Sequence, residues 1–291
     1  MDLGLFLQIF LNGLMIGGIY ALIASGFTLI LGVIQVFNFA QGQFYMLGAF
    51  IAIAVVTNLG LPYPVAILIA LVATALLGAA LYFGVIQFTT RSGFFNTMLV
   101  TVAFGTVVAQ SAMVSFGSRE AVLPPVVPGT LSLGGVTIPN GKLVVIAGAV
   151  VVMVALHLFM KTRIGVSMLA AAENRDVASL QGINPKRVFW VTMAVGCGLC
   201  GIAGALVVPV LAASGTMGST IFIKALLVVL VGGTGSMSGA LLAAFIVGIA
   251  ESYAFHFFGH LGLLVIFVLV AVLIFFRPGG LLGKPLPVPG E

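Results

Sequence analysis

Charge is the scarcest property of this sequence. Only 6% of its 291 residues are Asp, Glu, Lys or Arg, whereas 62% are hydrophobic. Soluble domains carry about a quarter charged residues, because their surface faces water. A soluble globular fold is therefore excluded, since the chain has too few polar side chains to cover one.

Long stretches of the chain have no charge at all. No charged residue lies between Leu3 and Thr90, between Val188 and Ile223, between Ala225 and Ala250, or between Ser252 and Phe276. Uncharged apolar runs of about twenty residues are typical of transmembrane helices, and these runs lack the alternation of membrane β-strands. We therefore predict an all-α, polytopic membrane helical bundle forming a single transmembrane domain over residues 1–291. About eight apolar segments are expected: Leu5–Val33, Gly42–Val56, Pro64–Gln87, Phe94–Phe116, Leu143–Met160, Val188–Val208, Phe222–Phe255 and Leu261–Phe276.

Two glycine-rich or polar breaks interrupt this apolar pattern. The seventh segment is too long for one helix and is interrupted at Gly232–Gly239, and residues Asn38–Gln43 separate the first two segments. A break at membrane depth is typical of half-helices or of a re-entrant turn lined by protein or water. We therefore expect broken or re-entrant helices at both places, with residues 222–255 entering and leaving at the same face.

Cysteine and histidine are also scarce. Cys197 and Cys200 are the only cysteines, and they lie in an uncharged run. A redox or metal role would need water or further ligands, so the pair favours helix packing beside neighbouring glycines. His256 and His260 are four residues apart, which permits metal binding on a helix, but Gly259 between them favours interfacial histidines. We predict no metal site.

The charges that are present gather in one loop. Residues 161–187 hold seven charged residues, of which five are basic. Basic loops remain on the cytoplasmic side of a membrane. The loop and the C-terminus, with Arg277 and Lys284, are therefore expected inside and the N-terminus outside. The seven residues are Lys161, Arg163, Glu173, Arg175, Asp176, Lys186 and Arg187.

A short amphipathic helix is expected inside this loop. Asp176 suits the positive end of a helix dipole, and Gly182 suits a left-handed C-terminal cap. Pro185 prevents the helix from continuing. Such a stub could present Ala178 and a few apolar side chains to a partner protein, or it could be an ordinary interfacial helix between two spans. Spacing alone leaves both interpretations open.

A few polar side chains fall within the apolar segments. Lys224 and Glu251 are ionisable, which is costly inside a membrane, so they could pair with each other, or Glu251 could face a pathway. Uncharged polar residues can line a path or hold helices together. Those at the first break also lie beside freed backbone groups, which favours a path there. The path candidates are Asn12, Asn38, Gln41 and Gln43.

Several motifs resemble those of ABC importer permeases. Asp176-Val177-Ala178-x-x-x-Gly182 resembles their Glu-Ala-Ala-x-x-x-Gly coupling motif, although the Ile-x-Leu-Pro that follows it in the longer motif is absent. A closer resemblance, to the LivH-type permease of branched-chain amino acid ABC importers, runs over nearly the whole chain. It departs at Gln41 and Gln43, where that family usually has His and Glu. The matching segments, in the family's order, are residues 17–22, 32–42, 181–184, 232–236 and 276–281.

The resemblance implies a permease subunit of an ATP-driven importer for branched-chain or other hydrophobic amino acids. It also implies a bacterial plasma membrane, two ATP-binding subunits, a second related permease and an extracytoplasmic solute-binding protein, beside membrane lipid. The chain has no Gly-x-x-x-x-Gly-Lys-Ser/Thr, so ATP is expected on the partners. No cofactor, enzymatic activity or nucleic-acid binding is expected here. The ATP-binding subunits are expected to dock at Glu173, Asp176, Ala178, Leu180, Gly182, Ile183 and Asn184.

Two other functions remain open. An ion-coupled carrier or channel could act without ATPase subunits, but such carriers generally place carboxylates or histidines along their route. This chain offers essentially Glu251. An intramembrane enzyme would need paired carboxylates or a nucleophile with its base, and no such set is apparent. Transport by the chain alone would favour the carrier, and turnover of a lipid or peptide would favour the enzyme.

Overall fold

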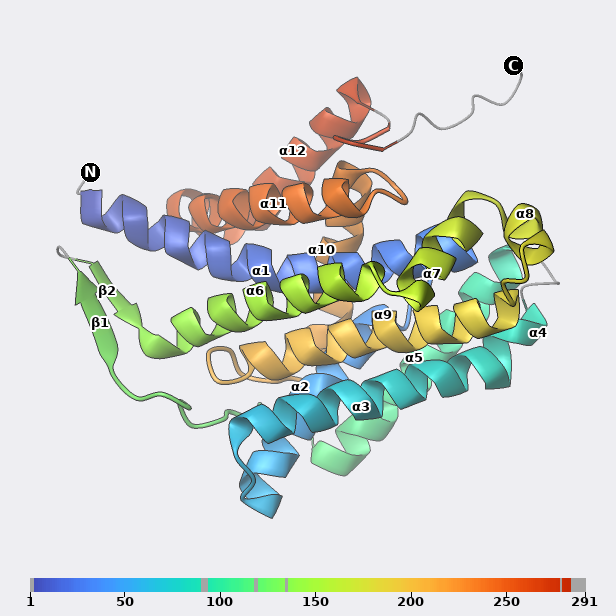
Figure 1. Cartoon of the computed structure of the whole chain (residues 1–291). Helices are drawn as coiled ribbons and strands as arrows, with labels where there is room; N and C mark the ends of the chain where they lie inside the picture. Colours follow the sequence, from blue (N-terminus) through green and yellow to red (C-terminus); the bar gives the residue numbers. More distant parts are fainter. Residues whose placement is uncertain (1–2, 90–93, 118–119, 134–135, 278, 284–291) are drawn as a thin grey trace.

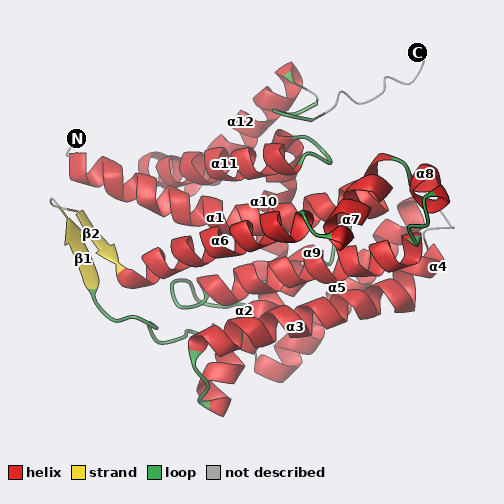
Figure 2. Cartoon of the chain, in the orientation of Figure 1, coloured by secondary structure: helices red, strands yellow, loops and turns green. Residues whose placement is uncertain are grey.

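The fold is a bundle of long helices, as Figures 1 and 2 show. The computed structural model describes residues 3–89, 94–117, 120–133, 136–277 and 279–283. In that part of the chain, seven helical spans are long and apolar enough to cross a membrane, the last of them the continuous stretch Met237–Phe276, and one shorter apolar helix spans Met217–Gly232. The predicted polytopic helical architecture is thus confirmed. The elements are α1 (Leu3–Ile34), α2 (Gln41–Leu59), α3 (Tyr63–Leu81), a π-helical turn (Tyr82–Ile86), α4 (Gln87–Thr89), α5 (Phe94–Phe116), β1 (Thr130–Leu133), β2 (Val136–Pro139), α6 (Asn140–Met160), α7 (Arg163–Glu173), α8 (Arg175–Leu180), α9 (Pro185–Val207), α10 (Met217–Gly232), α11 (Met237–Phe258), a 3-10 turn (Gly259–Leu261) and α12 (Gly262–Phe276).

Helix α1 forms the centre of the bundle. It packs against α11, α9, α6 and α10, and in Figure 1 it lies between α11 and α6. Small residues permit this close approach: a Cβ atom added to Gly13 would lie 2.6 Å from the Cα atom of Ile249 on α11. Because lipid gives no hydrophobic drive between helices, such close van der Waals packing holds them together.

Helix α9 forms a second packing centre with α2 and α3. A Cβ atom on Gly48 of α2 would lie 2.5 Å from the Cα atom of Gly201. Cys197 and Cys200 lie on this stretch of α9, where both are free thiols with no exposed surface. The structure therefore places the cysteine pair among packed helices.

The two ends of the bundle differ. The N-terminus and the β1–β2 hairpin lie at one end in Figure 1, and α8 lies at the other. The antiparallel hairpin pairs Thr130 with Pro139 and Leu133 with Val136. This hairpin was not predicted, because two four-residue strands inside an irregular loop carry too little pattern to be recognised.

The second break was expected at membrane depth, and the structure places it elsewhere. Residues Gly233–Ser236 form a turn between α10 and α11, and a Cβ atom on Gly32 near the end of α1 would lie 3.8 Å from the Cα atom of Gly235. The turn therefore lies at the α8 end of the bundle and not midway along the helices. Helix α11 runs from this turn to the hairpin end, where the Tyr253 hydroxyl donates to the Phe6 carbonyl.

Residues after α12 supply hydrogen-bond partners for the turn between α10 and α11. The Leu281 amide donates to the Val231 carbonyl at 2.7 Å, and the Leu282 amide donates to the Gly232 carbonyl at 3.2 Å. The last carbonyls of a helix have no partner within it. The segment Gly279–Gly283 supplies those partners, which the local sequence around the turn could not reveal.

Candidate functional site

The polar loop between α6 and α9 folds into two helices with capped ends. The Thr162 hydroxyl accepts from the Gly165 amide at 3.3 Å, and the Asn174 side chain accepts from the Asp176 amide at 3.0 Å. Asn184 accepts from the Lys186 amide at 3.0 Å and so begins α9. Such side-chain caps satisfy the free amides of a helix start. Helix α8 matches the predicted stub, whereas α7 was not predicted.

The end of α8 is fixed as expected from the sequence. Gly182 has φ of 83°, in the left-handed region that favours glycine. The Gly182 amide donates to the Ser179 carbonyl at 3.0 Å, and the Ile183 amide donates to the Ala178 carbonyl at 3.1 Å. Pro185 then opens α9. The stub is therefore held at both ends.

The exposed face of α8 is not the predicted one. Ala178 is only 3% exposed, whereas Leu180 is 88% exposed and Val177 is 49% exposed. Ala178 was predicted to form the contact surface for a partner, but its side chain packs into its own chain and leaves almost no surface for such a contact. Of the other docking candidates, Ile183 is half-buried, and Glu173, Asp176, Leu180, Gly182 and Asn184 are exposed.

Arg175, at the start of α8, joins this helix to the centre of the bundle. Its Nη2 donates to the carbonyls of Ile34 at 2.5 Å and Val33 at 3.3 Å, the last residues of α1. Its guanidinium lies 4.8 Å from the ring centroid of Phe189. Burial lowers the pKa of Arg175, and the nearby Tyr82 opposes that shift.

In the sequence, Arg175 served only as one of the basic residues that place the loop on the cytoplasmic side. Its contact with the end of α1 was not predicted. A usable signal existed. A basic residue opposes the positive dipole end at the start of its own helix, so an arginine in the first position of a short helix indicates a partner elsewhere. That partner is the negative end of α1.

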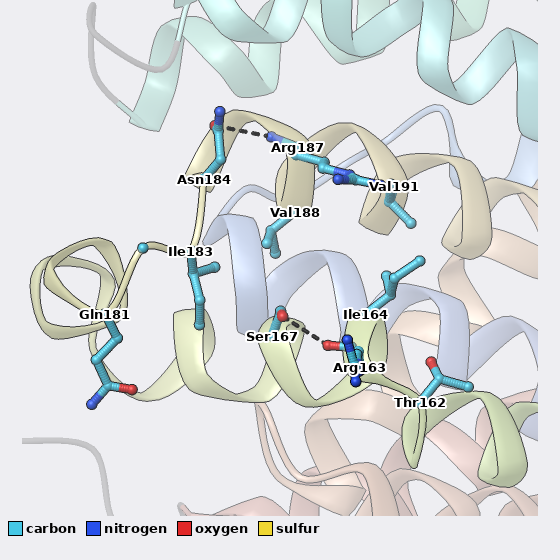
Figure 3. A pocket seen from close by; sticks show the side chains of 11 residues that line it. Thr162, Arg163, Ile164, Ser167, Gln181, Ile183, Asn184, Arg187, Val188 and Val191 are labelled. Carbon is cyan, nitrogen blue, oxygen red and sulfur yellow. Dashed lines mark hydrogen bonds between the residues drawn. The ribbon is translucent and has the colours of Figure 1, made fainter.

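A groove lies beside α8, between α7 and α9 (Figure 3). Its volume is about 610 Å³. Apolar side chains of Ile164, Val188 and Val191 form part of its lining, together with Arg163 and Arg187. None of the described residues that line it is acidic. The groove therefore combines an apolar surface with positive charge.

The first break turns back into the bundle. Gln35, the first residue after α1, has φ of 60° and so lies in the left-handed region. Asn38 Nδ2 donates to Gln41 Oε1 at 3.3 Å, and Gln41 Nε2 donates to the Gly196 carbonyl at 3.1 Å. Gly196 lies midway along α9, so α2 begins at the middle of that helix. Asn38 and Gln41 are both buried and hold this junction together.

The four path candidates do not form one cluster. Gln43 lines a cavity of about 400 Å³ together with Phe39, Thr106 and Ser219, between α2, α5 and α10. Asn12 instead accepts a hydrogen bond from Lys142 Nζ at 2.6 Å. Only Gln43 of the four therefore lines this cavity.

The two intramembrane ionisable residues meet. Lys224 Nζ lies 2.5 Å from Glu251 Oε1, and the Tyr20 hydroxyl donates to Glu251 Oε2 at 2.5 Å. The expected pairing of α10 with α11 is therefore present, and Tyr20 is a partner that sequence reasoning missed. His256 stacks edge-on against Phe257, and no cluster of three or more metal-ligating side chains occurs among the described residues.

Comparison with known proteins gives a consistent result. Residues 9–276 match the family described as branched-chain amino acid transport system / permease component. The chain is 32% identical to the high-affinity branched-chain amino acid transport system permease protein BraD of Pseudomonas aeruginosa, with 96% of each chain covered. It is 28% identical to the permease protein LivH of Escherichia coli, also with 96% of each covered. A probable LivH of Methanocaldococcus jannaschii is 25% identical over 79% of this chain and 75% of that protein.

Proposed function

The chain belongs to the family of branched-chain amino acid transport permease components, and we propose that it is the membrane-spanning permease subunit of an ATP-driven ABC importer for branched-chain or other hydrophobic amino acids. The observation that carries this proposal is α8. It is a short helix with fixed ends, an outward Leu180, and a direct hydrogen bond from Arg175 to the end of α1. Such a helix can receive a force and pass it into the bundle.

The partners follow from this role. Two ATP-binding subunits dock on the exposed face of α8, which includes Val177 and Leu180, and they carry the ATP because this sequence lacks a phosphate-binding loop. A second related permease completes the pore, and a solute-binding protein delivers the solute. The α8 end then faces the cytoplasm of a bacterial cell, and the N-terminus faces outward.

The cavity beside Gln43 is the proposed part of the solute path on this chain. Thr106 and Ser219 supply further uncharged polar groups there, and Phe39 and Phe222 supply an apolar wall with ring centroids 5.1 Å apart. An uncharged polar wall can bind polar groups of a solute without burying a charge of its own. Gln41 belongs to the helix junction instead.

The alternative of a self-sufficient ion-coupled carrier has less support. Such a carrier needs a titratable group along its route. Glu251 is the carboxylate that the sequence offers within the apolar runs, and both of its oxygens are engaged, by Lys224 and Tyr20.

Reconstitution tests the proposal. The purified chain, its ATP-binding subunits and the second permease are placed in proteoliposomes, and ATP-dependent uptake of labelled leucine is measured with the binding protein. Leu180→Asp should abolish co-purification of the ATP-binding subunits and uptake, because it places a charge on the contact face. Leu131→Asp, on an exposed leucine of the hairpin at the other end, is the matched control. Ion-driven uptake by the chain alone would instead support the carrier.

A further inference from the structure

Two cavities lie next to each other along α9. The α7–α9 groove reaches Val191 on α9 and Thr162 after α6. A second cavity, of about 280 Å³, begins one turn further on, at Ala194 on α9 and Phe159 on α6, and continues past Leu199. We call this second cavity, between α3, α6 and α9, the apolar cleft. The groove and the cleft thus follow one another on the same side of the molecule.

The two cavities share one face of α9 but differ in polarity. Val191, Val195, Leu199 and Ile202 recur at helical spacing and line first the groove and then the cleft. The described residues that line the apolar cleft include no charged side chain. The groove has Arg163 and Arg187, which are both exposed. A positive end therefore leads into an apolar channel.

We propose that the groove and the cleft together bind one anionic phospholipid. The headgroup phosphate lies at Arg163 and Arg187, and one acyl chain lies in the apolar cleft. Guanidinium groups bind phosphate oxygens through paired hydrogen bonds. Basic pockets between membrane helices at the cytoplasmic side are suited to anionic headgroups.

The dimensions agree with this ligand. Val191 and Ile202 are eleven residues apart on α9, which corresponds to about 16 Å along a helix. One leaflet of a bilayer contributes about 15 Å of hydrocarbon. The stretch of α9 that lines the two cavities, from Val191 in the groove to Ile202 in the cleft, thus matches the length of one acyl chain. An acidic segment of a partner protein could meet the two arginines, but it would leave the apolar cleft unfilled.

Native mass spectrometry of the full-length chain in detergent tests the proposal. The probes are phosphatidylglycerol and phosphatidylcholine of equal chain length. The wild-type chain should retain one phosphatidylglycerol in preference to phosphatidylcholine. Each basic residue near an anionic headgroup contributes about a factor of five, so Arg163→Gln/Arg187→Gln should bind phosphatidylglycerol about twenty-five-fold more weakly. Lys186→Gln/Arg277→Gln removes the same charge outside both cavities and should retain the lipid.

A second pair of variants tests the acyl-chain end without any change of charge. Ala155 lines the apolar cleft on α6, and Val151, one turn away on the same helix, is exposed and does not line it. Ala155→Trp should fill the cleft and lower phosphatidylglycerol occupancy, whereas Val151→Trp should not.

Three results would overturn the proposal. Equal lipid retention by the arginine double variant and its control would show that Arg163 and Arg187 do not bind the headgroup. Unchanged retention by Ala155→Trp, with loss in the arginine variant, would leave a simple anion site. Loss of assembly with ATP-binding subunits in the arginine variant, with lipid binding intact, would assign the arginines to a protein interface.

Discussion

The guanidinium of Arg175 lies 2.5 Å from the carbonyl oxygen of Ile34 and so joins the first residue of α8 to the last residue of α1. The C-terminal end of a helix carries a partial negative charge, which a cation stabilises. The next residue, Gln35, adopts a left-handed conformation and starts the turn towards α2. We therefore expect a displacement of α8 to be passed to the point where α1 ends and the first break begins.

Substitution of Arg175 should separate docking from transport. Arg175→Met keeps an apolar stem beside Phe189 but removes the donor to Ile34, while the exposed face of α8 stays unchanged. We expect normal co-purification with the ATP-binding subunits and at least tenfold less leucine taken up per ATP hydrolysed. Arg175→Lys should be intermediate, since an ammonium can donate to a carbonyl but lacks the planar fork. An unchanged uptake-to-ATP ratio in Arg175→Met would contradict this role.

Ala178 should behave as a structural residue. Because its side chain is buried within the chain, Ala178→Arg forces a bulky charge into a packed site, at a cost of about 1–3 kcal/mol or more. Thermal unfolding of the purified chain in detergent should show a lower midpoint. Ser179→Arg, on the exposed neighbouring position, is the control. If Ala178→Arg unfolded like the wild type but failed to bind ATP-binding subunits, Ala178 would be a contact residue after all.

The Lys224–Glu251 pair should show strong coupling in a double-mutant cycle. Glu251→Gln leaves the half-buried Lys224 charge without its partner, which typically costs about 3–5 kcal/mol. Removing both charges in Lys224→Met/Glu251→Gln should be much less destabilising than Glu251→Gln alone. Thermal or denaturant unfolding of the four proteins gives the coupling energy. Additive effects of the two single substitutions would show that the pair is not coupled.

Thiol labelling should distinguish the polar residues of the first break. Gln43→Cys should react with small water-soluble reagents, because Gln43 lines a cavity. Asn38→Cys and Gln41→Cys should stay protected, since both positions are buried at the junction with α9. The two native cysteines have no exposed surface, so the wild type serves as the blank. Labelling of Asn38→Cys at the rate of Gln43→Cys would place the path deeper in the junction.

The amino-acid sequence determined the class of fold by composition alone. Charge-free runs such as Leu3–Thr90 can be stable only where the surroundings are apolar, and a helix satisfies its own backbone there. The position of α8 could also be predicted from nearby residues. Its start is capped by Asn174 and favoured by the acidic Asp176, and its end depends on a left-handed glycine at Gly182 and a proline at Pro185. Each of these residues acts within a few positions of the chain.

Tertiary structure decided which side chains meet. Arg175 and Ile34 are 141 positions apart in the chain. No sequence pattern near either residue indicates that the two meet. Ala178 and Leu180 are only two positions apart, yet one is buried and the other is 88% exposed. The face that a six-residue helix buries depends on how α7 and α9 pack around it. At the turn Gly233–Ser236, the distant residues Leu281 and Leu282 satisfy the last carbonyls of α10. Each of these outcomes depends on contacts between distant segments, which form only when the whole bundle is packed.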